Sequence, residues 1–140
     1  MKSATSPLLL LLFACMTLAG CRKAIEDIQT KALIDIITSG RWVIDQFTEA
    51  STEYAKDYAS YEFKFNENGT VDAYMGGSVT TGTFVVDAIN ARITSRFPAG
   101  SAAILLRLNE TWTVTKASIS QVEAKPTDAA RNAFLRIRTK

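Results

Sequence analysis

The chain has 140 residues, of which 47% are hydrophobic, 21% charged and 9% aromatic, a composition typical of one soluble globular domain. Sixteen Lys and Arg residues against fourteen Asp and Glu residues leave a net charge of +2, which disfavours a dedicated nucleic-acid-binding protein. The chain contains no histidine, so the usual general base, the commonest metal ligand and the usual partner of a nucleophilic serine or cysteine are missing.

The first residues have the pattern of a secretory signal peptide. Lys2 precedes an unbroken apolar run over residues 8–13, which is too short for a transmembrane helix of about 20 residues. The run leads into Leu18-Ala19-Gly20-Cys21, which resembles the lipobox of bacterial lipoproteins. The resemblance implies that residues 1–20 are removed as a lipoprotein signal peptide and that the Cys21 thiol carries the lipid. The alternative is an ordinary signal peptide cut nearby, with Cys21 a bystander.

Lipidation of Cys21 has consequences for location and chemistry. Arg22, rather than an aspartate, follows the cysteine, and by resemblance to enterobacterial lipoproteins this implies an outer-membrane anchor, with the membrane face left open. Cys15 leaves with the signal peptide and Cys21 is taken by lipid. We therefore expect the mature chain to have no disulfide, no metal site and no cofactor.

Residues 21–39 are expected to form the lipidated cysteine and a short amphipathic helix. Apolar residues recur at spacings of three and four over residues 25–37, and Gly40 follows as a stop. Two interpretations are open. The helix is a spacer that lifts the domain off the membrane, or it packs on the end of the following domain, and the continuous apolar stripe favours packing.

After Gly40 the apolar period changes from about 3.6 residues to two, which indicates β-strands. Strands are predicted at residues 42–47, 61–65, 71–75, 81–86, 93–97, 111–115, 119–124 and 134–138, and residues 102–108 are left open between strand and helix. Short connections favour antiparallel neighbours, and eight strands are enough to close a small barrel. We therefore predict an eight-stranded antiparallel up-and-down meander barrel over residues 40–140. A two-layer sandwich is the alternative.

Gly40-Arg41-Trp42 resembles the G-x-W motif of the lipocalin superfamily. Together with the lipobox, the Asn66–Thr70 turn and the Thr81–Phe84 segment, it makes the chain similar to small lipocalin-like lipoproteins of Bacteroidetes over residues 38–140. The resemblance implies that Trp42, preceded by Gly40, plugs the barrel floor. It also implies that a basic residue near the end of the barrel, Arg136 or Arg138, packs on this tryptophan.

Strand alternation places an aromatic set inside the barrel. The residues expected to line a ligand pocket are Tyr61, Phe63, Phe65, Met75, Phe84 and Trp112. We therefore predict a lipid-anchored envelope protein that binds a small apolar or amphipathic ligand. In the alternative, side chains fill the barrel, which then docks to another envelope protein. Docking would use strand edges, the loop around Tyr54 and Tyr58, or a basic face with Arg92 and Arg96.

Catalytic motifs are missing from the sequence. The chain has no G-x-S-x-G elbow, no phosphate loop and no H-E-x-x-H motif, so we predict that it is not an enzyme and lacks catalytic residues. A hydrolase whose site is assembled from carboxylates distant in sequence is the third hypothesis. The expected partners are membrane lipid through acylated Cys21 and a small hydrophobic ligand or an envelope protein, and nucleic acid is not expected.

Overall fold

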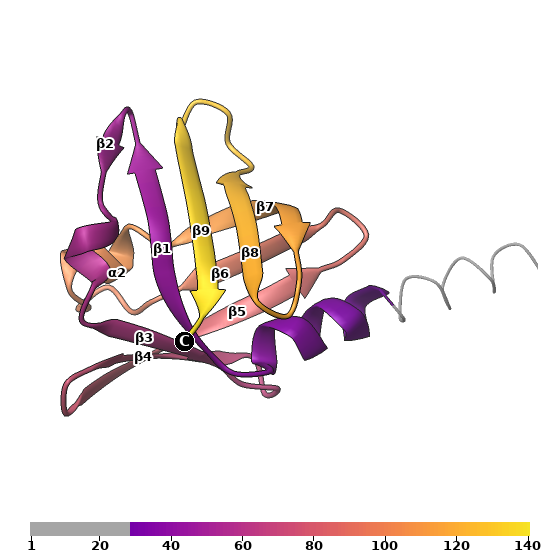
Figure 1. The fold of residues 1–140 in the computed structure, drawn as a ribbon, viewed down its shortest axis with the longest axis horizontal. Coiled ribbons are helices and arrows are strands. Elements are labelled where there is room, and N and C mark those ends of the chain that lie inside the picture. Colours follow the sequence, from indigo (N-terminus) through magenta and orange to yellow (C-terminus); the bar gives the residue numbers. More distant parts are fainter. Residues whose placement is uncertain (1–28) are drawn as a thin grey trace, which may run out of the picture.

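The computed structural model describes residues 29–140, so the predicted signal peptide and Cys21 lie outside the described residues. A helix over residues 29–38 precedes a sheet with the strand order β2-β1-β3-β4-β5-β6-β7-β8-β9, in which β1 also pairs with β9 (Figure 1). This last pairing closes β1 and β3–β9 into an eight-stranded antiparallel barrel, and the two-residue β2 is added at the end of β1. The predicted fold is confirmed.

Every strand pairs with its antiparallel neighbours in chain order, as short turns require. The strands are β1 (Arg41–Glu49), β2 (Thr52–Glu53), β3 (Tyr61–Phe65), β4 (Thr70–Met75), β5 (Ser78–Asp87), β6 (Arg92–Arg96), β7 (Glu110–Ala117), β8 (Gln121–Pro126) and β9 (Ala133–Thr139). Two short helices lie in the connections, η1 (Ala55–Tyr58) and α2 (Ala103–Leu106). The segment that the sequence left open between strand and helix is therefore partly helical.

Strand β1 contains an irregularity that sets which side chains face the core. Its pairing with β9 shifts register between Ile44 and Gln46. Trp42 and Ile44 are buried at a spacing of two, but the next buried residue is Phe47, three positions further on. The extra residue of a β-bulge changes the alternation in this way, so a strict two-residue period would place Phe47 on the wrong face.

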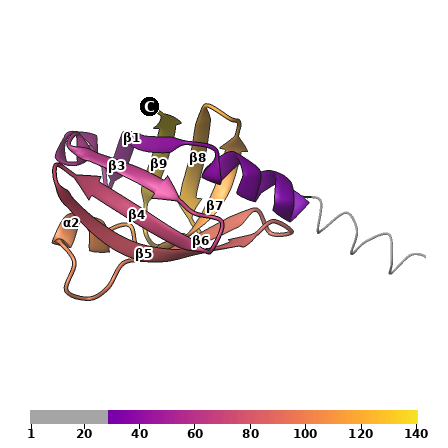
Figure 2. The ribbon, with the colours of Figure 1, turned by 90° about the horizontal axis from the view of Figure 1, so that it is seen from below.

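The two ends of the barrel are built differently. At one end, which we call the closed end, η1 and α2 cover the interior, and the Tyr58 hydroxyl donates a hydrogen bond to the Ile104 carbonyl over 2.8 Å. Tyr58 and Leu105 are both 1% exposed there. At the other end, the helix end, the N-terminal helix meets β1, and the β5–β6 and β7–β8 turns lie on the same side (Figure 2). The interior is therefore covered by chain at the closed end.

The N-terminal helix touches the barrel through its last turn. Ile37 is 1% exposed, and its carbonyl accepts a 2.7 Å hydrogen bond from the indole nitrogen of Trp42. Lys31 and Ala32 are exposed, and the start of the helix projects away from the strands (Figure 1). The packing interpretation is thus confirmed for the last turn of the helix, and the spacer interpretation stays a prediction. No helix within residues 29–140 is long and apolar enough to span a bilayer.

Candidate functional site

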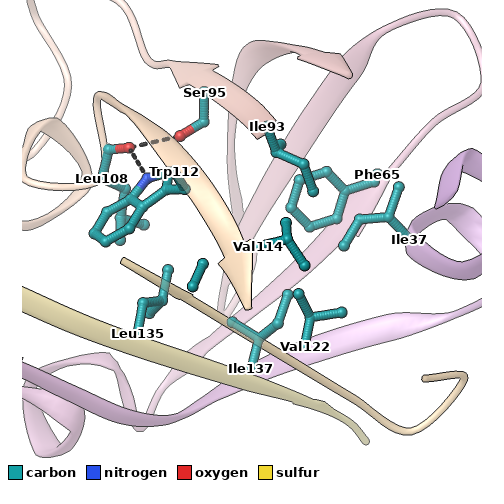
Figure 3. Close-up of a pocket in the computed structure, with 11 residues that line it drawn as sticks. Ile37, Phe65, Ile93, Ser95, Leu108, Trp112, Val114, Val122, Leu135 and Ile137 are labelled. Carbon is teal, nitrogen blue, oxygen red and sulfur yellow. Dashed lines mark hydrogen bonds between the residues drawn. The ribbon is translucent and has the colours of Figure 1, made fainter. Parts of the chain in front are cut away.

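The barrel interior contains a cavity of about 70 Å³ (Figure 3). Its lining comes from β3, the strands β6–β9, the segment between α2 and β7, and the last turn of the N-terminal helix. The lining residues are Ile37, Phe65, Ile93, Ser95, Leu108, Trp112, Val114, Val122, Ala124, Leu135 and Ile137. Inward side chains of consecutive antiparallel strands converge in this way when a sheet closes on itself.

The cavity wall is chemically apolar. Ser95 is the one hydroxyl among the lining side chains, and its Oγ donates to the Leu108 carbonyl over 2.5 Å. The Trp112 indole nitrogen donates to the same oxygen over 3.2 Å (Figure 3). Both polar side-chain groups in the wall therefore donate to a protein carbonyl, and neither needs a ligand as its hydrogen-bond partner. The wall therefore suits an apolar group.

The volume limits what the cavity can hold. Small-molecule sites usually measure about 300–1,000 Å³, so a cavity of about 70 Å³ accepts a narrow group of a few carbon atoms and excludes a bulky ring system. The aromatic side chains of Trp112 and its neighbours occupy much of the remaining interior. The barrel is thus mostly filled, with an apolar gap at its centre.

The cavity is lined by both buried and partly buried side chains. Phe65, Val114, Leu135 and Ile137 are partly buried, whereas the other apolar lining residues are buried, among them Ile37 at 1% and Trp112 at 4% exposed. The guanidinium of Arg131 lies 5.5 Å from the centre of the Trp112 ring, and this cation–π contact supports the deep wall. Trp112 therefore forms a well-buried part of the cavity wall.

The six residues predicted to line a pocket lie in three different environments. Phe65 and Trp112 line the cavity. Tyr61, Phe63 and Phe84 are buried in the packed core but are not among the lining residues.

The expectation that Met75 points inward is wrong, because its side chain is 44% exposed. Met75 is the last residue of β4 and pairs with Ser78 beside the β4–β5 turn, so it lies beyond the covered interior although its alternation is inward.

Several lining residues were not singled out from the sequence. Val122 with Ala124, and Leu135 with Ile137, follow the two-residue alternation of β8 and β9, so this signal was present in their short segments. Ile37 carried no such signal, because its position depends on how the helix docks against the barrel.

The residues predicted for the barrel floor are only partly brought together. Trp42 is fully buried and follows Gly40 at the start of β1. Arg136 and Arg138 instead face outward and bind the Asp45 carboxylate at 2.7 and 3.3 Å. Hydrogen bonds and charge from the two arginines hold the pKa of Asp45 below its ordinary value.

The prediction that Arg136 or Arg138 packs on Trp42 is therefore wrong. Leu135 and Ile137 take the inward positions of β9, and alternation sends both arginines to the outer face.

Of the three surfaces predicted to dock a protein, the structure retains only the basic face of β6 as an open surface. Tyr58 is buried, and the Tyr54 ring lies 4.2 Å beneath the Arg107 guanidinium, so neither forms an open aromatic patch. Closure of β1 on β9 uses the long strand edges that docking would need. Arg92 and Arg96 do share the outer face of β6, at its first and last residue.

An ionic network at the closed end was not predicted. The Glu49 carboxylate accepts hydrogen bonds from Arg107 at 2.6 Å and from Arg131 at 2.7 Å. Arg131 also contacts the Glu110 carboxylate at 3.3 Å and donates to the Arg107 carbonyl at 2.7 Å. Two cations face two anions, and the partners are up to 82 residues apart. The network therefore ties the end of β1 to the connections before β7 and β9.

The network also affects protonation. The hydrogen bond from Arg131, aided by Arg107, lowers the pKa of Glu49, although partial burial opposes the shift. Burial raises the pKa of Tyr58 far above its ordinary value. A carboxylate held ionised by two arginines is a poor general acid. The Glu49 carboxylate therefore serves to connect the chain segments of the closed end. Within residues 29–140, no three His, Cys, Asp or Glu side chains gather as metal ligands.

We expect Glu49→Gln to lower the free energy of unfolding at pH 7 by about 1–2 kcal/mol, because it weakens two charge-assisted hydrogen bonds. The folded-state pKa of Glu49 lies below the ordinary value of 4.5, so its ionic contribution is present above about pH 4.5 and is lost as pH falls through the folded pKa. Urea titrations across pH should show the two proteins converge in acid. Glu67→Gln, in the exposed β3–β4 turn, is the matched control and should have no effect at either pH.

The order of the strands, their closure through β1 and β9 and the apolar interior define a lipocalin-like β-barrel. Solved structures agree. The chain is similar to a DUF4847 family protein from Bacteroides vulgatus, with 12% identity and a TM-score of 0.57 over 76% of this chain and 96% of that one. It is similar also to a lipocalin-like protein from Bacteroides uniformis, with 16% identity and a TM-score of 0.56 over 75% of this chain and 99% of that one.

These similarities concern the fold, because the identities are low. No known family model matches the sequence, and no curated protein matches it.

Proposed function

We propose that this chain is a non-catalytic, lipid-anchored lipoprotein of the outer membrane whose barrel binds a narrow apolar group, such as the end of one acyl chain. The observation that carries the proposal is the apolar cavity of about 70 Å³ in the barrel interior, with Trp112 in its wall. Its wall has no polar side chain that lacks a protein partner, and its size excludes bulky ligands.

The anchor is supported by the sequence Leu18-Ala19-Gly20-Cys21, which precedes residue 29 by a short segment. Two or three acyl chains give stable membrane attachment, because each buried methylene contributes about 0.8 kcal/mol. We expect Cys21→Ser to leave the membrane fraction or to stall before processing, as measured by fractionation and mass spectrometry. Normal processing together with continued membrane attachment would contradict the anchor.

Ligand binding is tested with a fluorescent fatty acid, cis-parinaric acid, added to the purified full-length protein. Ala124→Leu places a larger side chain in the cavity wall, and we expect it to weaken binding about tenfold or more by filling the space. The matched control is Val85→Leu, since Val85 is 66% exposed on the outside of β5. This control should bind as the unmodified protein does.

An unchanged affinity of Ala124→Leu, or no binding by the unmodified protein, would contradict a ligand in the cavity. The second candidate, a filled barrel that docks to an envelope protein, would then be favoured. The small size of the cavity is the observation that supports this alternative.

A further inference from the structure

Two strongly exposed isoleucines lie in turns at the helix end of the barrel. Ile89, in the turn between β5 and β6, is 56% exposed, and Ile119, in the turn between β7 and β8, is 76% exposed. From these side chains and the position of the anchor we infer that the helix end of the barrel rests on the bilayer, with Ile89 and Ile119 inserted between lipid headgroups. This inference rests on the proposed lipid anchor.

The topology places both turns on the side from which the N-terminal helix leaves. Arg92, which begins β6, pairs with Thr113 in the middle of β7, and β7 continues from there to the β7–β8 turn. Thr139 at the end of β9 pairs with Trp42, directly after the helix. In Figures 1 and 2 the helix and the β5–β6 turn project in the same direction. The two isoleucines and the N-terminal side of the chain therefore share one end of the molecule.

The length of chain before the helix restricts which end can meet the membrane. Residue 29 is eight positions after Cys21, so their Cα atoms are at most about 29 Å apart. Strand β5 has 10 residues and spans roughly 33 Å along the barrel wall. A bilayer that holds Cys21 therefore lies within reach of the helix end, whereas the closed end lies a further strand length away.

The chemistry of this end suits a lipid interface. Apolar side chains on turn tips bury their surface among acyl chains without breaking backbone hydrogen bonds. Lys116 is exposed beside the Ile119 turn and forms no ion pair within residues 29–140, so it can meet an anionic headgroup. Two isoleucines are too few to hold the protein on a membrane, so their effect is to orient a barrel that the acyl chains already attach.

This orientation also bears on the proposed ligand. Two residues of the cavity wall lie at the helix end, Ile37 in the last turn of the helix and the partly buried Phe65 at the end of β3. With that end on the bilayer, this part of the cavity wall lies nearest to lipid, which shortens the path of an acyl chain to the cavity.

The closed end supplies a matched comparison. Met75 and Val79, which flank the β4–β5 turn, are 44% and 52% exposed. They present apolar surface of similar kind at the opposite end of the barrel, beyond the reach of a short tether. They should not touch lipid if the inference is right.

The test uses the full chain expressed in bacteria, with the lipidated protein purified from membranes and reconstituted into vesicles of phosphatidylethanolamine and phosphatidylglycerol. Ile89→Cys, Ile119→Cys and Gly77→Cys each receive a bimane label, and spin-labelled lipid acts as quencher. Labels at 89 and 119 should lose about half of their fluorescence or more, while the label at 77 stays unquenched.

A second comparison uses a label at Asn90→Cys. The double variant Ile89→Ser with Ile119→Ser should lose this quenching, whereas Met75→Ser with Val79→Ser should keep it. Both doubles should retain the unfolding temperature of the parent protein, since all four side chains are exposed.

The outcomes separate the inference from the anchor. If the protein floats with vesicles but the labels at 89 and 119 are no more quenched than the label at 77, the orientation is wrong and the anchor stands. If the protein does not float, and behaves as Cys21→Ser does, the anchor and the orientation both fail.

Discussion

Trp42→Ala is expected to lower the free energy of unfolding by about 3–5 kcal/mol, the range found when a large buried aromatic side chain is removed. Trp42 is 0% exposed, and it is the largest fully buried side chain within residues 29–140. Its indole nitrogen also holds the Ile37 carbonyl at 2.7 Å, so the substitution removes the tie between barrel and helix as well as core volume. Urea unfolding followed by circular dichroism measures the change.

Trp42→Phe separates the two contributions. It keeps most of the aromatic volume but deletes the hydrogen bond to Ile37, so we expect a loss of about 1–2 kcal/mol and faster proteolysis of the N-terminal helix. A loss for Trp42→Ala below about 1 kcal/mol, a size typical of surface changes, would show that Trp42 is not a central core residue.

Gly82→Ala is expected to destabilise the barrel by about 3 kcal/mol. A Cβ atom at Gly82 would lie 2.5 Å from the Arg96 carbonyl oxygen and 2.9 Å from a ring carbon of Phe97. The oxygen belongs to the backbone, so β5 and β6 would have to separate to admit the methyl group. Thermal unfolding of the variant should show a clear fall in Tm.

Gly77→Ala is the control for this substitution. Gly77 lies in the β4–β5 turn, and a Cβ atom there would meet nothing within 4 Å. We expect a change within about 0.5 kcal/mol. Equal effects at Gly82 and Gly77 would contradict the close approach of β5 and β6 as the reason for glycine at position 82.

Local patterns in the sequence were sufficient to predict the fold. The alternation of Tyr61, Phe63 and Phe65 predicted β3 with its observed bounds, and the Asn66–Thr70 turn led directly into β4. A strand buried on one face has a period of two, and short turns leave consecutive strands antiparallel. Closure follows because eight such strands can remove their edges by pairing the first with the last.

The candidate site was predicted less well, because it depends on distances across the barrel. Alternation identifies inward side chains, but it does not tell which of them pack together and which border a gap. Phe65 and Trp112 border the cavity, whereas Phe63 and Phe84 fill the core. That difference arises from the packing of side chains from opposite walls of the barrel. The sequence pattern of one strand does not predict this packing.

By itself, the sequence determined the strand order and the preceding helix, since each depends on neighbouring residues. Only the tertiary structure decided that Glu49 joins Arg107 and Arg131, and that Arg136 faces outward to Asp45. These contacts join residues that are 58 to 91 positions apart in the sequence. They form only when the barrel closes and brings β1 next to the later strands and their connections.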